Sequence, residues 1–248
     1  MKLVSWVENC IHREVAQRFS RKLATQLPPT SLISITFDDF PQSALKVAGS
    51  MLEENGLRGT YYASMGLMGR QTEVGEMCTA DDLRTVVETG HELACHTFDH
   101  LSSVRARSNQ VRESCARNRL AAANVFGGYQ LRNFSFPFGS VTLSAKSSLA
   151  STYESCRTVK CGINRNPVDL GFLLANPIYS AIPISELQRL IAKNAEQLGW
   201  LILYTHDVSL QPSAWGCTPS YFRAVLSSAI ASGASIVTVA EAVRRFRL

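Results

Sequence analysis

Three apolar runs of this chain end in residues whose side chains could do chemistry. The polar residues that follow these runs supply two carboxylates and three imidazoles: Asp38, Asp39, His96, His100 and His206. These side chains are common ligands of divalent metal ions, and they are also the usual general acids and bases of enzymes. The types and positions of these residues therefore indicate a catalytic site rather than a purely structural role.

A catalytic metal site needs three nitrogen or oxygen ligands and one position left open. His96 and His100 have ligand spacing, and one of the two adjacent aspartates would complete the set. The other aspartate would then be free to act as a base toward water that the cation makes more acidic. His206 comes from a distant part of the chain and suits a general acid. The predicted reaction class is metal-assisted hydrolysis.

The elements that must position these residues alternate between strand and helix. Strands are predicted at 32–37, 59–63, 92–95, 134–136, 156–159, 200–204 and 234–239, and helices at 42–57, 80–88, 108–126, 143–153, 185–198 and 219–232, with a further helix at the end. Such alternation predicts parallel strands joined by right-handed crossovers, in a barrel or in an open sheet. In a parallel barrel the carboxyl ends of all strands share one face, so the candidate side chains would converge there.

An additional amphipathic helix is predicted at the N-terminus. Its apolar residues recur every three or four positions: Val4, Val7, Ile11, Val15, Phe19 and Leu23. Charged and polar residues occupy the other face, and Pro28 and Pro29 are expected to end the helix. We expect this helix to cap the domain; the alternative is a helix that lies on an anionic membrane surface. The predicted organisation is a helix and linker at 1–29 and one domain at 30–248.

Composition excludes several classes of protein. The chain has 248 residues, of which 46% are apolar and 18% charged, and its net charge is +5. This is typical of a globular domain with a sizeable core, and the mild positive charge does not predict a nucleic-acid partner. The opening segment lacks the unbroken apolar stretch of a secretory signal, so we expect a cytoplasmic protein. The seven cysteines form no Cys-x-x-Cys pair and are interpreted as buried thiols.

Four short motifs make the chain similar to a known family. In chain order they are Thr36-Phe37-Asp38-Asp39, His96-Thr97-Phe98-Asp99-His100, Phe136-Pro137-Phe138-Gly139 and Leu203-Tyr204-Thr205-His206. Over about residues 31–243 the chain resembles the polysaccharide deacetylase family, the NodB-homology domain of carbohydrate esterase family 4. The resemblance implies an α/β fold, a distorted (β/α)7 barrel in a single domain, that removes N-acetyl or, less often, O-acetyl groups from sugars.

The resemblance also implies a role for each candidate residue. Asp38 would be the catalytic base, and His206 would be the acid that protonates the leaving amine. One divalent metal ion, usually zinc in this family, would be held by Asp39, His96 and His100. These assignments follow from the matching positions of the motifs, and they agree with the metal-assisted hydrolysis that the residue types indicate.

One departure from the family concerns the surroundings of the base. The family usually carries Arg two residues before the Pro of the third motif, whereas this chain has Ser135. Without that cation the pKa of Asp38 loses a downward shift. Arg132 and Arg157 are candidates to supply the charge, and we favour Arg157 because it lies on the next predicted strand.

A second departure concerns the acid and the substrate. The family's fourth motif, with an Asp that tunes the acid His, is not recognisable; Asp169 and Asp207 are the candidates, and a structural role fits either. The resemblance implies that the backbone N–H of Phe138 stabilises the oxyanion. Among the aromatic residues we expect Phe138 and Trp215 to meet substrate, because a loop aromatic outside any strand pattern is suited to ligand contact.

The function predicted from all of this is removal of N-acetyl groups from an intracellular sugar intermediate. A nucleotide-linked sugar, a lipid-linked sugar or a short oligosaccharide for a surface polysaccharide or lipopolysaccharide is expected as substrate, with peripheral membrane contact suiting the lipid-linked case. Two alternatives stay open: a hydrolase of non-sugar amides, and a homologue that binds carbohydrate but has lost catalysis.

Overall fold

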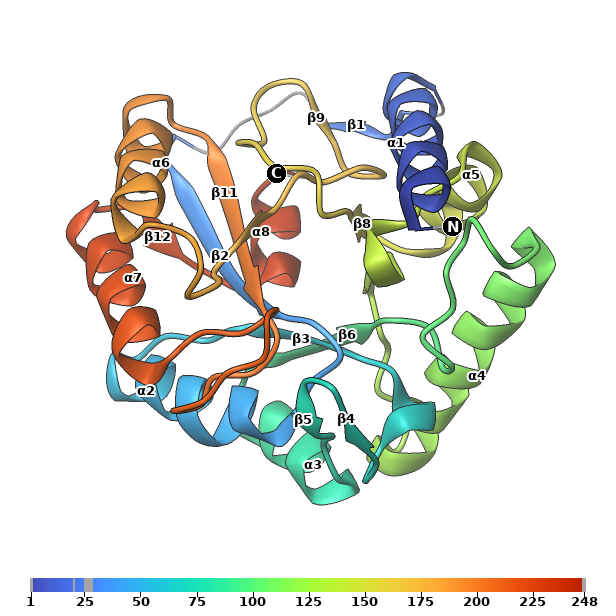
Figure 1. Cartoon of the computed structure of the whole chain (residues 1–248), viewed down its shortest axis with the longest axis horizontal. Helices are drawn as coiled ribbons and strands as arrows, with labels where there is room; N and C mark the ends of the chain where they lie inside the picture. The colour runs from blue at the N-terminus through green and yellow to red at the C-terminus, as the bar shows by residue number, and fades with distance from the viewer. Residues whose placement is uncertain (1, 20, 25–28, 247–248) are drawn as a thin grey trace.

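The computed structural model describes residues 2–19, 21–24 and 29–246, with side chains from residue 10 onward. Its centre is a curled parallel sheet (Figure 1). The strand order is β10 (Asn176–Pro177), β11 (Trp200–Thr205), β2 (Leu32–Phe37), β3 (Thr60–Ala63), β6 (Glu92–Cys95), β7 (Asn133–Ser135) and β8 (Ser155–Arg157), and β12 (Ser235–Ile236) also pairs with β2. Each neighbouring pair along this order is parallel. The predicted distorted (β/α)7 barrel is confirmed.

Most helices surround the sheet on its outside, and the last one lies within the ring of the other elements (Figure 1). They are α2 (Ser50–Glu54), which continues a π-helical segment at Ala44–Gly49, α3 (Ala80–Glu88), α4 (Ser108–Phe126), α5 (Leu143–Thr152), α6 (Ile184–Glu196), α7 (Pro219–Ala231) and α8 (Val239–Arg245). Threonine side chains cap α3, α5, α7 and α8 by accepting a backbone N–H of the first turn. The helices predicted at 80–88 and 108–126 have the predicted bounds.

The central strands are buried at every position. All six residues of β2 and all six of β11 are inaccessible to solvent because the barrel interior covers one face and helices cover the other. The path of strands ends at β8 and β10. Next to β8, residues 170–173 form backbone hydrogen bonds with that strand. Just before them, β9 (Val168–Asp169) pairs with β1 (Leu23–Ala24) in a small antiparallel sheet. A second small sheet joins β4 (Gln71–Thr72) and β5 (Gly75–Glu76).

The N-terminal helix differs from its prediction. The helix α1 covers Lys2–Arg18 and ends before Leu23, which lies in β1. Ile11, Val15 and Phe19 of the predicted apolar face are exposed, whereas Ala16 is buried. The side chains of Val4 and Val7 and the position of Pro28 lie outside the described residues. The helix therefore packs through a different face from the one that the apolar spacing predicted.

Polar contacts explain how α1 is held. It lies beside α5 (Figure 1), and the fully buried Lys146 of α5 donates hydrogen bonds to the carbonyls of Ala16 (2.8 Å) and Phe19 (2.9 Å) at the end of α1. The same ammonium group pairs with Asp169 at 2.6 Å. A cation at the C-terminus of a helix stabilises its unpaired carbonyls. Asp169, a candidate partner of His206, is thus bound to a lysine instead.

The cysteines agree only in part with their prediction. Five of the seven cysteines are buried, but Cys161 is exposed and Cys10 is half-buried, so the prediction of seven buried thiols is wrong for these two; all seven are free. Across the described residues, no helix combines the length and the apolar character needed to span a membrane.

The Lys146 contacts generate a stability prediction. Lys146→Met removes a buried cation and leaves the carboxylate of Asp169 and two helix-end carbonyls without it, so we expect the free energy of unfolding to fall by about 3–5 kcal/mol. Urea denaturation followed by circular dichroism measures this change. Lys193→Met, which alters an exposed lysine of α6, is the control and should change the free energy by less than about 0.5 kcal/mol; a similar small effect of Lys146→Met would contradict the prediction.

Candidate active site

The candidate residues lie together at the carboxyl end of the parallel sheet. Asp38 follows β2, His96 follows β6, and His206 follows β11, while Ser135 and Arg157 are the last residues of β7 and β8. Because parallel strands all end on the same side, residues from five strands reach one place although the chain separates them by more than one hundred positions.

Asp39, His96 and His100 form a cluster suited to a metal ion. The Oδ1 atom of Asp39 lies 3.4 Å from Nε2 of His96 and 3.0 Å from Nε2 of His100, and the three ligand atoms lie within 4.8 Å of one another. Nδ1 of His96 lies 2.8 Å from the carbonyl oxygen of Ser135, which directs Nε2 toward Asp39. Oδ1 of Asp39 is buried and has no hydrogen-bond partner of good geometry among the described residues.

These distances fit a shared cation. Ligand atoms around a tetrahedral zinc ion at about 2.0–2.1 Å lie about 3.3 Å apart, close to the two distances that Asp39 makes here. Burial would raise the pKa of Asp39, but the imidazoles of His100 and His96 hold it well below its usual value. The carboxylate is therefore ionised and available as a ligand, together with two imidazole nitrogens.

The backbone around this cluster is unusual. Five non-glycine residues adopt a left-handed conformation, with φ between 53° and 67°: Asp39, Phe40, Thr97, His100 and Phe138. Each such residue costs on the order of 1 kcal/mol or more, and positions of this kind concentrate at functional sites. The turn at Asp39 also explains how two adjacent aspartates point in different directions.

Two side chains of α4 hold the strained 97–100 loop in place. Ser114 of α4 accepts the backbone N–H of Phe98 (3.0 Å) and of Asp99 (3.1 Å), and its hydroxyl donates to the Asp99 carboxylate at 2.8 Å. Arg117 forms an ion pair with the same carboxylate. Asp99 therefore fixes the loop that carries His100 and is engaged away from the metal cluster.

Asp38 is paired with a buried arginine. Its carboxylate forms an ion pair with Arg157, whose guanidinium also lies 2.5 Å from the hydroxyl of Ser135 and sits between the rings of Tyr62 (5.0 Å) and Tyr204 (4.9 Å). Burial would raise the pKa of Asp38, but the charge of Arg157, the imidazoles of His96 and His206 and the hydrogen bond from Arg157 together outweigh burial, and the pKa of Asp38 is lowered. The carboxylate is therefore held in its ionised, proton-accepting form.

The origin of this arginine follows from strand register. Ser135 of β7 and Arg157 of β8 are directly paired, so a long side chain at 157 reaches over the small side chain at 135. The guanidinium of Arg157 thus contacts both the carboxylate of Asp38 and the hydroxyl of Ser135. Arg132, the other candidate, lies on the surface and contacts Glu154 at 3.3 Å.

His206 is oriented by a backbone carbonyl. Its Nδ1 lies 3.0 Å from the carbonyl oxygen of Trp215, and its Nε2 lies 4.0 Å from Oδ2 of Asp39. Asp207 accepts hydrogen bonds from the backbone N–H of Ser213 (2.8 Å) and from its hydroxyl (2.5 Å), which shapes the loop that carries Trp215. The interpretation of Asp207 as a direct partner of His206 is not supported, because its carboxylate binds this loop.

The aromatic residues divide into buried and exposed groups. Phe138 is 64% exposed and Trp215 is 48% exposed, and the ring of Phe138 lies 4.3 Å from that of His100. Tyr179 lies 6.2 Å from the His206 ring and 6.0 Å from Trp215. Tyr179 could not be predicted from the sequence, because it follows β10, a two-residue strand with no apolar run to predict it. Three aromatics of the sheet are buried instead: Tyr61, Tyr62 and Tyr204.

Comparison with known proteins identifies the family. Residues 26–153, just over half of the chain, match the family model described as polysaccharide deacetylase. The chain belongs to this family. Its members that remove acetyl groups from carbohydrates use a divalent metal ion, and the cluster of Asp39, His96 and His100 is a candidate site for one here.

Individual relatives agree with this assignment. A bifunctional xylanase/deacetylase of Pseudobutyrivibrio xylanivorans is 30% identical over 110 residues, which is 44% of this chain and 17% of that protein. The chain therefore spans less than a fifth of this relative. The fold matches a chitin deacetylase of Colletotrichum lindemuthianum, with a TM-score of 0.63, 18% identity and coverage of 89% of both chains. It also matches a family 4 acetyl xylan esterase of Clostridium thermocellum in complex with a cobalt ion, with a TM-score of 0.59, 19% identity and coverage of 85% and 89%.

Because Ser135 and Arg157 are paired in adjacent strands, we predict the effect of exchanging these two residues. Arg157→Ser leaves Asp38 buried without its cation, so its pKa should rise and the acid limb of the kcat/KM profile should move to higher pH. Acetate release near neutral pH should fall by about 100-fold or more. The double variant Ser135→Arg/Arg157→Ser returns a guanidinium from the paired position and should recover most of that loss.

The control for the swap is Arg132→Ser, which changes an exposed arginine and should leave both the rate and the pH profile unchanged. Circular dichroism of each variant checks that the barrel has folded. If the double variant is folded and no more active than Arg157→Ser, the role assigned to Arg157 is wrong.

Proposed function

We propose that this chain is a metal-dependent hydrolase that removes N-acetyl groups from a sugar. The observation that carries the proposal is the convergence, at one end of the barrel, of an ionised Asp38 paired with Arg157 and a three-residue metal cluster faced by His206. A base, a set of metal ligands and an acid in one place are the groups that hydrolysis of an unactivated amide requires.

Asp38 is suited to take a proton from the attacking water. Its carboxylate is buried and kept ionised by Arg157, and it is adjacent to Asp39 of the metal cluster. Arg157 acts on the reaction through Asp38 and is a positioning residue. The cation–π contacts with Tyr62 and Tyr204 fix the guanidinium in turn.

His206 is suited to protonate the leaving amine. With its Nδ1–H donated to the carbonyl of Trp215, the ring presents Nε2 to the site. On the opposite side, the backbone N–H of Phe138 is proposed to donate to the oxyanion, since a fixed backbone donor needs little reorganisation when charge develops on the acetyl oxygen. Phe138 occupies a strained left-handed position that orients its peptide group.

Asp39, His96 and His100 would hold the divalent cation, for which we propose zinc on account of the nitrogen-rich ligand set. When bound, the cation supplies Lewis acidity that polarises the acetyl carbonyl and acidifies water. The hydrogen bond from Nδ1 of His96 to Ser135 fixes the ring that would bind it.

The substrate that we propose is an intracellular sugar intermediate, in a cytoplasmic protein. A nucleotide-linked sugar, a lipid-linked sugar or a short oligosaccharide of surface polysaccharide or lipopolysaccharide synthesis is the class of substrate that we propose. The alternative of an inactive carbohydrate-binding homologue rests on Ser135 and on the unrecognisable fourth motif, and the ion pair between Arg157 and Asp38 weighs against the first of these two grounds.

The role assigned to Asp38 predicts that its replacement lowers activity and leaves metal binding intact. Asp38→Asn removes the proton acceptor but no metal ligand, so the purified variant should keep its metal content while kcat falls by about 100- to 10,000-fold. Acetate release measured over nucleotide-linked, lipid-linked and oligomeric N-acetylated sugars, with acetylated xylan as the O-acetyl comparison, identifies the substrate. A chelator should abolish release by the wild type.

The matched variant is His96→Gln, which should lose both metal and turnover. Full turnover of Asp38→Asn would reject Asp38 as the base, and full turnover of the metal-free wild type would reject metal dependence. Release of acetate from non-sugar amides alone would favour the hydrolase of small amides over the sugar deacetylase.

The exposed aromatics generate a binding prediction. Phe138→Ala and Trp215→Ala remove rings that we expect to stack on the sugar, so KM should rise by about fivefold to tenfold with a smaller change in kcat. Leu210→Ala, which alters an 87% exposed residue of the loop after His206, is the control and should leave KM unchanged. Unaltered KM in both aromatic variants would place the sugar elsewhere.

A further inference from the structure

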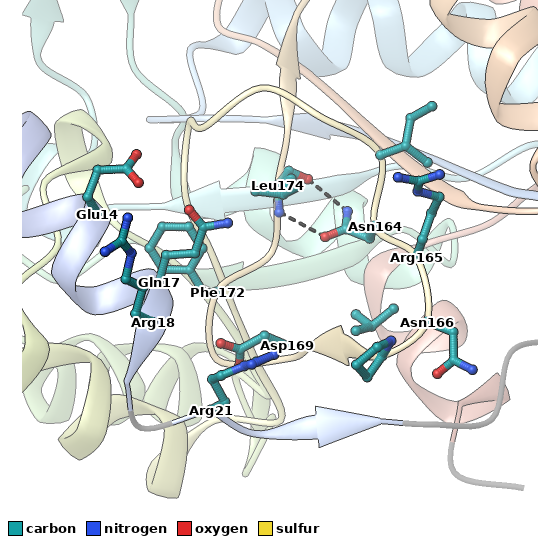
Figure 2. A pocket seen from close by; sticks show the side chains of 13 residues that line it. Glu14, Gln17, Arg18, Arg21, Asn164, Arg165, Asn166, Asp169, Phe172 and Leu174 are labelled. Carbon is teal, nitrogen blue, oxygen red and sulfur yellow. Dashed lines mark hydrogen bonds between the residues drawn. The ribbon is translucent and has the colours of Figure 1, made fainter.

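A cleft of about 880 Å³ lies between α1 and the segment that precedes β10. Figure 2 shows Arg18 and Arg21 on the α1 side of this cleft and Arg165 on the facing segment. The floor is apolar and includes Phe172 and Leu174. No candidate catalytic residue lines the cleft.

The charge of the cleft is strongly positive once its ion pairs are considered. Its two carboxylates are both engaged, Glu14 with Lys160 and Asp169 with Lys146. In contrast, none of the three cleft arginines has an ion-pair or hydrogen-bond partner within the described part of the chain. Lys160 and Lys146 pair with the acidic residues, the charge of Arg18 also acts on Glu14, and the three exposed arginines line the same cleft.

An apolar stripe borders this cleft. It consists of Ile11, Val15, Phe19 and Leu23, which are 58%, 40%, 57% and 47% exposed. Ile11 and Val15 are four residues apart and therefore share one side of α1, and Phe19 follows directly after the end of that helix. Arg18 precedes Phe19 directly and follows Val15 by one helical turn, so it belongs to the edge of the stripe as well as to the cleft. Large apolar residues gathered in this way mark an interaction surface.

We propose that the stripe and the arginine-lined cleft together dock the protein on the surface of an anionic phospholipid membrane. The apolar side chains would enter the headgroup–acyl boundary, and Arg18, Arg21 and Arg165 would bind lipid phosphates in and around the cleft. Apolar residues flanked by arginines are typical of surfaces that bind a membrane interface, and here α1 contributes Ile11, Val15 and Arg18 while the residues after it contribute Phe19 and Arg21. The guanidinium groups supply both the charge and the bidentate donors that phosphate oxygens accept.

The position of this surface leaves the catalytic site open. Asn164 lines the cleft and pairs with Trp200 at the start of β11, whereas His206 follows the other end of that strand. Six strand residues span roughly 17 Å, so docking and catalysis use opposite ends of the barrel wall. The docking proposal therefore does not depend on the proposed reaction, and Asp38→Asn should bind membranes as the wild type does.

Vesicle co-sedimentation of the full chain tests the proposal. The probes are vesicles of phosphatidylcholine alone and vesicles with about 30% phosphatidylglycerol. The wild type should bind the anionic vesicles and not the neutral ones, and added salt should weaken binding. Each arginine near an anionic surface contributes about fivefold, so Arg18→Gln/Arg21→Gln/Arg165→Gln should weaken partitioning by about 100-fold. Ile11→Ser/Phe19→Ser should weaken it by at least tenfold.

A matched control uses an exposed arginine and an exposed isoleucine of α7, in Arg223→Gln/Ile230→Ser, which should bind vesicles like the wild type. Phe19→Trp gives a direct readout, since a brominated lipid should quench its fluorescence beyond the background of the native tryptophans. Failure of the wild type to bind anionic vesicles, or equal loss in the α7 control, would overturn the proposal. A dimer in light scattering that the stripe variant abolishes, without vesicle binding, would assign the stripe to a second copy of the chain instead.

Discussion

The ion pair between Asp38 and Arg157 is the interaction on which the site depends. Both side chains are almost completely buried, and a buried carboxylate without a nearby cation takes up a proton and loses its value as a base. The pair also separates the functions of two neighbouring aspartates. Asp38 faces a permanent guanidinium charge, whereas Asp39 faces imidazoles. Because each carboxylate has its own partner, both can be ionised at the same time despite their mutual repulsion.

The second constraint is the conformation of the loops that follow the strands. Asp39, His100 and Phe138 all adopt left-handed backbone geometry, which isolated peptides of these residues disfavour. Such positions persist because the strands before them are buried and the loops are anchored, as Ser114 anchors the 97–100 loop. The rigid barrel therefore fixes the positions of Asp39, His100 and Phe138.

Strand register brings the cation of Arg157 to the base. Ser135 and Arg157 are partners in adjacent parallel strands, and the guanidinium of Arg157 reaches the carboxylate of Asp38. The solved relatives share the fold at under 25% identity, and their acetylated substrates differ. Loops that carry Phe138, Tyr179 and Trp215 surround the site and are the natural place for such differences.

The amino-acid sequence by itself determined the strands of the main sheet except β10, most helices and the residues at the strand ends, because a doubly buried parallel strand is a continuous apolar run that stops where polar side chains begin. It also predicted an arginine on the strand after β7. Tertiary structure alone decided that Arg157 touches Asp38, that a carbonyl orients His206, and which face of α1 is covered. Register, backbone acceptors and helix docking depend on neighbours that are distant in the chain, and residue spacing within one segment carries no information about them.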